Sequence, residues 1–384
     1  MITRADADKL RNATAKAPSV LSVYLQVPVD LAEHRGLPTR ARELIKSAAS
    51  RQGDRRGAEV RAADLESVVR TVASRSNEWL GQTAAVFACA EIGLLEALPL
   101  PGHLTEQAII ACRPHIRPLL AAMQRNPVFR AAIVDAKHAW ILHIDGNQIE
   151  TVAERTGAGV RSTGFAGWYG LEGYRIQQRI MELSKQHFRD TVNVLERSSD
   201  GGSLPLVLGG HENEISQFVS ALPRAVRQAV VGSFSVDLQT ATPGRVRELA
   251  WSVIASWSLR SEQQLIHDVL NQPPHVSVAT GLEGCLSASS ARAIAQLILA
   301  DDQMVPGFAC GICGALSTGE SGEDCPDPAE ARRPVPDLLD ELADRTLDGG
   351  GQVTAVRDPP FTAAARLRFP ITATERSQSA SRLP

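Results

Sequence analysis

The sequence predicts an α/β (α+β) fold divided into three domains. Three observations support this: a length of 384 residues, strand-like runs that alternate with helix-like runs, and a proline-containing break at residues 271–274. One hydrophobic core rarely serves so long a chain, so two or three domains are expected. In chain order, the predicted segments are a first domain over residues 1–128, a middle domain over 129–271, a third domain over 272–373 and a disordered tail over 374–384.

The first predicted domain interleaves strands with helices. Residues 19–27 form a β-prone run, and the apolar positions of the charged segment 39–80 have helical spacing. Two strands follow, over 84–90 and 93–101, and then a helix over 116–124. Interleaved elements of this kind predict an α/β or α+β domain.

The middle predicted domain opens with a β-hairpin, because an Asp-Gly turn at residues 145–147 separates two β-rich runs, 131–144 and 148–154. A glycine-rich loop (155–173) and a long amphipathic helix (174–197) come next. The remainder alternates strand, helix, strand and helix over residues 204–210, 215–223, 229–237 and 243–270. This order predicts a mixed or parallel sheet flanked by helices.

The third predicted domain is a smaller α/β unit, also with a mixed or parallel sheet and flanking helices. We expect two helices, over residues 291–301 and 336–347, and two strands, over 352–358 and 363–371. A cysteine-bearing insertion over residues 308–328 separates the two helices.

The composition limits which partners are expected. The net charge is −3 and the pI is about 6.3, whereas proteins that hold RNA by overall charge are usually strongly basic. Any RNA contact must therefore come from local basic patches. No stretch approaches the roughly 20 apolar residues that span a bilayer, and no secretory signal opens the chain. We therefore expect a cytoplasmic protein with reduced thiols and no membrane partner.

Three segments together carry a resemblance to a known family. They are the hairpin, loop and long helix with His187-Phe188-Arg189 near its middle; the cysteine insertion GFACGICGALSTGESGEDCP; and the closing segments VPDLLDELADRTLDGGGQVTAV and AAARLRFPI. In this order they resemble the bacterial, Balon-like branch of the archaeal and eukaryotic class-1 release factor and Pelota superfamily. The resemblance implies a Y-shaped molecule. Its first domain would reach the decoding centre, its middle domain the peptidyl-transferase centre, and its third domain a translational GTPase.

Release factors of this family hydrolyse peptidyl-tRNA with a Gly-Gly-Gln loop that precedes the long helix of the middle domain. Here residues 165–173 read FAGWYGLEG, and this departure argues against release activity. The tripeptide does occur at Gly350-Gly351-Gln352, directly after an amphipathic helix. Glycines just past a helix end are typical of a left-handed cap, so we interpret this tripeptide as a cap.

Basic and aromatic residues of the middle domain are the candidate RNA contacts. Exposed aromatics can stack on unpaired bases while cationic side chains meet phosphates. The candidates are Arg161, Trp168, Tyr169, Arg175, Arg179, Lys185 and Arg189. Two other interpretations stay open: the aromatics can pack onto the domain, or the helix can present an ordinary solvated face, since acidic residues alternate with the basic ones. His187 is interpreted as a packing or hydrogen-bonding residue.

Cys310, Cys313 and Cys325 resemble a zinc ribbon that lacks one ligand. Structural zinc takes four ligands, usually from two Cys-x-x-Cys pairs, and Pro328 stands where the fourth cysteine belongs. Two states stay open: a zinc ion whose ligand set is completed by a carboxylate, and a degenerate knuckle without metal.

The leading functional hypothesis is a non-catalytic, ribosome-associated translation factor that occupies the A site as a hibernation or stress factor. Its expected partners are the ribosomal RNA of the A site and, through the third domain, elongation factor Tu or another translational GTPase. The chief alternative is an enzyme, a peptidyl-tRNA hydrolase or ribosome rescue release factor, in which Gln177 or Gln178 orients water. A protein-interaction module with no RNA role is the third hypothesis, and it fits the acidic pI.

Overall fold

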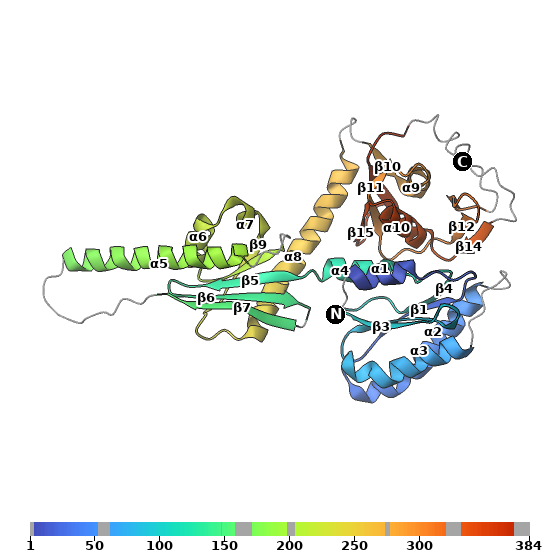
Figure 1. Ribbon diagram of the computed structural model, residues 1–384, viewed down its shortest axis with the longest axis horizontal. Helices are drawn as coiled ribbons and strands as arrows, with labels where there is room; N and C mark the ends of the chain where they lie inside the picture. The colour runs from blue at the N-terminus through green and yellow to red at the C-terminus, as the bar shows by residue number, and fades with distance from the viewer. Residues whose placement is uncertain are drawn as a thin grey trace. The chain divides into compact units, whose positions relative to one another are not determined.

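The computed structural model describes residues 4–52, 62–146, 148–157, 171–197, 204–272, 277–319 and 332–371 (Figure 1). The chain forms two compact units: unit 1 comprises Met1–Arg125 and Glu262–Pro384, and unit 2 comprises Asn126–Ser261. The first and third predicted domains thus share one unit, and we call their described parts the N-terminal and C-terminal lobes of unit 1. The three-domain division stays a prediction, and the predicted tail lies outside the described residues.

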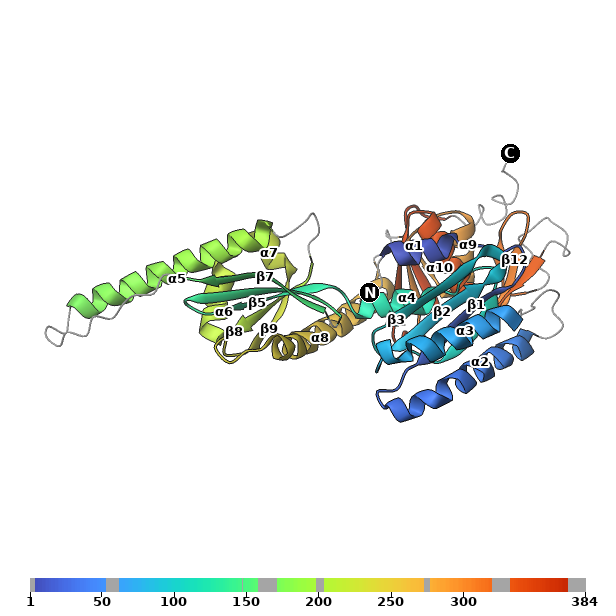
Figure 2. The ribbon, with the colours of Figure 1, turned by 60° about the horizontal axis from the view of Figure 1, so that its bottom comes forward.

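The N-terminal lobe is built on an antiparallel sheet with strand order β3-β2-β1-β4. Its strands are β1 (Val20–Gln26), β2 (Thr83–Cys89), β3 (Leu94–Leu100) and β4 (Gln107–Ala111). Helices α2 (Leu37–Gln52) and α3 (Ala62–Arg75) lie side by side along one face (Figure 2). Helices α1 (Arg4–Asn12) and α4 (Arg117–Arg125) contribute to the core on the other face. Because both faces are covered, β1 and β2 are buried along almost their whole length, which explains their continuous apolar sequence.

The C-terminal lobe contains a four-stranded mixed sheet of order β10-β16-β11-β15. Its strands are β10 (Val278–Thr280), β11 (Ile294–Ala300), β15 (Gln352–Val356) and β16 (Ala363–Leu367), and only the β11–β15 pair is parallel. Helices α9 (Gly281–Ser290) and α10 (Leu338–Asp348) pack on it. A small second sheet, from β12 (Gly307–Cys310), β13 (Leu316–Ser317) and β14 (Arg332–Val335), carries the cysteine turn.

The helix predicted over residues 291–301 is wrong, because most of this segment is strand β11. The helix lies just before it, as α9. Arg292 adopts a positive φ of 53°, which ends the helical path and turns the chain into the sheet. A short apolar run fits a buried central strand as well as a buried helix, so periodicity alone could not separate the two.

Unit 2 is a five-stranded mixed sheet of order β7-β6-β5-β8-β9. Its strands are β5 (Phe129–Val134), β6 (His138–Asp145), β7 (Gln148–Thr156), β8 (Leu206–Gly210) and β9 (Val230–Ser235), and β5, β8 and β9 run parallel. Helices α5 (Leu171–Arg197) and α6 (Glu212–Ala221) pack on one face. The short α7 (Arg224–Ala229) precedes β9, and α8 (Pro243–Leu270) covers the opposite face before it ends in unit 1.

The predicted hairpin of unit 2 is confirmed, since β6 and β7 pair through the Asp145 turn and Gly146 takes a left-handed φ of 57°. The run 131–144 is however two strands, not one. Asp135 Oδ1 accepts the backbone amides of Lys137 and His138, both at 2.6 Å. An aspartate that binds the amides two and three residues ahead reverses the chain, so β5 and β6 form a second hairpin.

The Gly-Gly-Gln tripeptide near the C-terminus is a helix cap, as predicted. Helix α10 is followed by Gly350, which has a left-handed φ of 71°. The Gly351 amide donates to Thr346 O at 2.8 Å and the Gly350 amide to Leu347 O at 2.9 Å, the paired bonds of a Schellman cap. Gln352 then begins β15. Separately, none of the helices in the described ranges is long and apolar enough to cross a membrane.

Candidate functional site

Helix α5 divides into a buried face and an exposed face. Phe188, Val192 and Leu195 are at most 5% exposed, and Phe188 packs edge-on against Phe218 of α6 with ring centroids 5.4 Å apart. The apolar residues recur at helical spacing, so the amphipathic pattern of the sequence directs one stripe into the core and the opposite stripe outward.

Three of the predicted RNA contacts lie on the exposed face of α5. Arg179, Lys185 and Arg189 are all exposed. Lys185 pairs with Glu182 at 3.3 Å, an exposed helical pair that contributes little energy. No ion pair of Arg179 or Arg189 occurs among the residues that the structure describes. Because both side chains are exposed, a phosphate could reach either guanidinium group.

The other predicted contacts cannot be placed. Arg161, Trp168 and Tyr169 lie in the segment 158–170, outside the described residues. The backbone at Arg175 and Gln177 is helical, but their side chains are not described. Gln178, the second candidate for orienting water, is exposed on α5.

His187 of α5 lies beside Gly157, the residue that follows β7. Its side chain is buried, which lowers its pKa below the usual value, so the ring is neutral near pH 7. A Cβ at Gly157, the last described residue before α5, would lie 3.1 Å from His187 Nδ1. The Gly157 amide donates to Lys137 O at 2.5 Å. This burial agrees with the interpretation of His187 as a packing or hydrogen-bonding residue.

A cleft at the carboxyl ends of the parallel strands was not found by sequence reasoning. It has a volume of about 270 Å³, and the edge where it lies is a common ligand site in α/β sheets. Its charged and histidine residues are Asp135, Lys137, His138, His211, Glu214 and Asp237. The sequence pattern that could have predicted this cleft is the position of these residues directly after buried strands.

The cleft is poorly suited to RNA. Three carboxylates face a single lysine there, and a phosphate would be repelled. Asp135 uses both oxygens locally, in its turn and with His138 Nδ1 at 3.1 Å. Across the described ranges, no three histidine, cysteine or acidic side chains group as a metal site would require. The exposed face of α5 that carries Arg179, Lys185 and Arg189 is therefore the better candidate for nucleic acid.

The cysteine turn supplies two thiols in a knuckle-like geometry. Cys310 Sγ accepts the Ile312 amide at 3.4 Å and Cys313 Sγ accepts the Ala315 amide at 3.5 Å. Gly314 closes the turn with a left-handed φ of 75°. Structural zinc needs four ligands, and Cys325, the third cysteine of the predicted set, lies outside the described residues. The zinc site stays a prediction.

One family model matches the chain, over residues 114–254, and its description is "Bacterial archaeo-eukaryotic release factor family 10". This segment contains α4, the whole sheet of unit 2 and the first part of α8. No curated protein sequence matches the chain.

Solved structures similar to this chain include an archaeal translation termination factor, aRF1, with 14% identity, coverage of 94% of this chain and 96% of that chain, and a TM-score of 0.25. Pelota of Archaeoglobus fulgidus has 15% identity, coverage of 77% and 82%, and a TM-score of 0.36. A ribosome-bound archaeal Pelota has 16% identity, coverage of 76% and 79%, and a TM-score of 0.41. At these identities and TM-scores the solved structures carry no argument about the function of this chain.

Proposed function

We propose that the chain belongs to the release-factor/Pelota superfamily, because residues 114–254 match a family model described as a bacterial archaeo-eukaryotic release factor. We further propose that it is a cytoplasmic ribosome-binding factor that occupies the A site without releasing the nascent chain. It would act as a hibernation or stress factor. It would contact ribosomal RNA, and its C-terminal lobe would bind elongation factor Tu or another translational GTPase.

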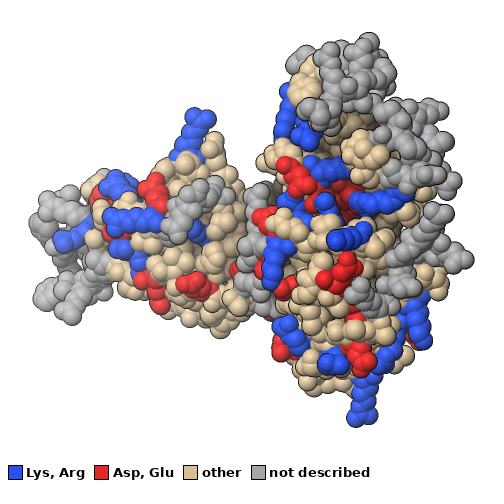
Figure 3. Space-filling view, turned by 45° about the vertical axis from the view of Figure 1, so that its right-hand side comes forward, with Lys and Arg blue, Asp and Glu red and all other residues tan. Residues whose placement is uncertain are grey.

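The observation that supports this proposal is the exposed face of α5, on which Arg179 and Arg189 form no ion pair with any residue that the structure describes. Contacts between arginine and phosphate give affinity that does not depend on the RNA sequence. Such contacts suit a factor that binds one location on the ribosome. On the face drawn in Figure 3, basic and acidic side chains lie interspersed, and the net charge is −3. Local contacts through the α5 face therefore explain RNA binding better than electrostatic attraction by the whole protein surface.

The absence of release activity is proposed from the sequence before α5. The only Gly-Gly-Gln of the chain is the α10 cap at residues 350–352, and residues 165–173 contain none. A factor that keeps its RNA contacts but lacks the residue that orients water can still block the site. Gln178, exposed on α5, keeps the hydrolase alternative testable.

The proposal predicts salt-dependent ribosome binding without release. Purified protein is sedimented with ribosomes that carry peptidyl-tRNA, at low and at high salt, and released peptide is measured in the same samples. We expect co-sedimentation at low salt that weakens steeply as salt rises, because phosphate contacts displace counterions. No peptide should be released.

Two results would decide for the alternatives. Peptide release that the substitutions Gln177→Ala or Gln178→Ala abolish would establish the hydrolase. Failure to sediment with ribosomes at any salt concentration would favour the protein-interaction module.

A further inference from the structure

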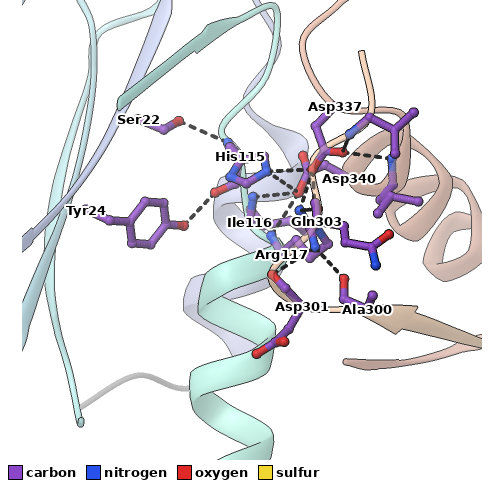
Figure 4. A network of polar contacts seen from close by, with 12 residues as sticks. Ser22, Tyr24, His115, Ile116, Arg117, Ala300, Asp301, Gln303, Asp337 and Asp340 are labelled. Atoms are coloured by element: carbon purple, nitrogen blue, oxygen red, sulfur yellow. Dashed lines mark hydrogen bonds and ion pairs between the residues drawn. The ribbon is translucent and has the colours of Figure 1, made fainter. Parts of the chain in front are cut away.

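The two lobes of unit 1 are joined by a buried polar network centred on Arg117 and Asp337 (Figure 4). Arg117 begins α4 in the N-terminal lobe, and its side chain is 3% exposed. Its Nε and Nη2 donate to Asp337 Oδ2 at 3.1 and 2.9 Å. Its Nη1 donates to Ala300 O at 2.7 Å and to Asp301 O at 3.1 Å. One arginine thus ties α4 to both α10 and the end of β11.

His115 adds a second link to the same carboxylate. Its side chain is 2% exposed, and Nε2 lies 3.1 Å from Asp337 Oδ2. The backbone holds the residue in place, because the His115 amide donates to Ser22 Oγ at 3.0 Å and the Tyr24 hydroxyl donates to His115 O at 2.5 Å. The imidazole is therefore held toward α10 by the N-terminal sheet.

Asp340 is the second carboxylate at this contact, and its surroundings differ from those of Asp337. Its Oδ1 accepts the amides of Ile116 and Arg117 at 3.1 and 2.8 Å, so α10 caps the start of α4 across the lobes. The same oxygen lies 3.7 Å from His115 Nε2. Within the described part of the chain, no arginine or lysine forms an ion pair with Asp340. Two acidic groups thus share one imidazole, and of the two only Asp337 forms an ion pair with a described arginine, Arg117.

We propose that protonation of Asp340 stabilises the contact between the two lobes of unit 1 (the joint). The joint is then more stable at mildly acidic pH than at neutral pH. This goes beyond ribosome binding and is independent of it. The physical reason is that an ionised Asp340 is a mostly buried charge beside a second ionised carboxylate, and both burial and like charge oppose ionisation.

The titration of the two carboxylates supports this direction. Burial raises the pKa of Asp340 to about 6. Burial also opposes the ionisation of Asp337, but the His115 hydrogen bond and the Arg117 charge together hold its pKa below the usual value. Asp337 therefore stays ionised between pH 7.5 and 5.5 while Asp340 takes up a proton. Asp340 binds this proton more tightly when the lobes are packed together than when they are separated. The packed state therefore becomes more stable as the pH falls through about 6.

Other charged groups line the same site as Asp340. They come from α1, the segment before α4, and α10, and they are Arg11, Arg113, Glu341 and Asp344. Burial raises the pKa of Asp344 as well, so its contribution acts in the same direction. Tyr24, which also faces the site, has a pKa raised well above its usual value by burial and stays neutral.

Hydrogen exchange of amides that bond across the joint tests the proposal. The reporters are the amides of Ile116 and Arg117, and that of Ala355, which donates to Gln124 Oε1 at 2.8 Å across the same joint. Protection factors, corrected for the intrinsic exchange rate, are compared at pH 5.5 and 7.5. A shift from a pKa near 3.8 to about 6 predicts about fourfold greater protection at pH 5.5.

The variant Asp340→Asn removes the titrating group while keeping an acceptor for the two amides. In the wild-type protein, the protection factor at pH 5.5 divided by that at pH 7.5 is expected to be about four. In the variant we expect this quotient to be about fourfold smaller. The matched control is Asp302→Asn, an exposed aspartate of the C-terminal lobe, which should keep the wild-type ratio. Equal protection of the wild-type protein at both pH values would overturn the proposal even if the variant failed to fold. An unchanged ratio in a folded Asp340→Asn protein would also overturn it.

Discussion

Replacement of Arg117 by methionine is expected to lower the free energy of unfolding of unit 1 by about 3–5 kcal/mol, the usual effect of removing one partner of a buried ion pair. The methionine keeps most of the apolar stem, but it leaves Asp337 buried at 1% exposure without its cation. The carbonyl groups of Ala300 and Asp301 lose their donor as well. Denaturant-dependent hydrogen exchange of the β1 and β11 amides measures the loss in both lobes.

The control for this prediction is Arg70→Met. Arg70 is 76% exposed and faces Glu66 at 3.9 Å, so its replacement should change stability by no more than about 0.5 kcal/mol. If Arg117→Met were as mild as Arg70→Met, the buried network would not be what holds the lobes together.

Reversal of charge at Arg179 and Arg189 together is expected to weaken ribosome binding by roughly 100-fold at low salt, about tenfold for each lost phosphate contact. The slope of log affinity against log salt should also fall by about 2, since each phosphate contact accounts for about 1. Both side chains are exposed on α5, so the fold should tolerate Arg179→Glu with Arg189→Glu. Titration of labelled protein with ribosomes at several salt concentrations measures both quantities.

A second double variant controls for net charge. Arg245→Glu with Arg260→Glu makes the same change in charge on α8, which covers the opposite face of the sheet in unit 2. It should leave affinity and slope nearly unchanged. Equal losses in the two double variants would mean that overall charge, rather than the α5 face, governs binding.

Local features of this fold could be predicted from the sequence because they depend on residues close together. The Asp145-Gly146 hairpin, the amphipathic α5 and the glycine cap after α10 each follow from a few neighbouring residues. The mistake at residues 291–301 arose where tertiary burial, not local pattern, decides between strand and helix.

The joint of unit 1 could not be predicted, because its partners are far apart in the chain. Arg117 and Asp337 are separated by 220 residues, and each looks like an ordinary surface residue in its own segment. The candidate RNA site was predictable in part, because helical spacing placed Arg179, Lys185 and Arg189 on an exposed face. Arg161, Trp168 and Tyr169 lie outside the described residues.

The most direct measurement of the central claim is a photo-cross-link from the α5 face in the ribosome complex. Asn193 is exposed one turn beyond Arg189, so a photoreactive residue there preserves both arginines, and Ser256, exposed on α8, is the control position. If α5 lies along RNA, position 193 should cross-link to ribosomal RNA at the A site and position 256 should not. Cross-links from position 193 to protein alone, or none in a complex that still sediments, would contradict an RNA-binding role for this helix.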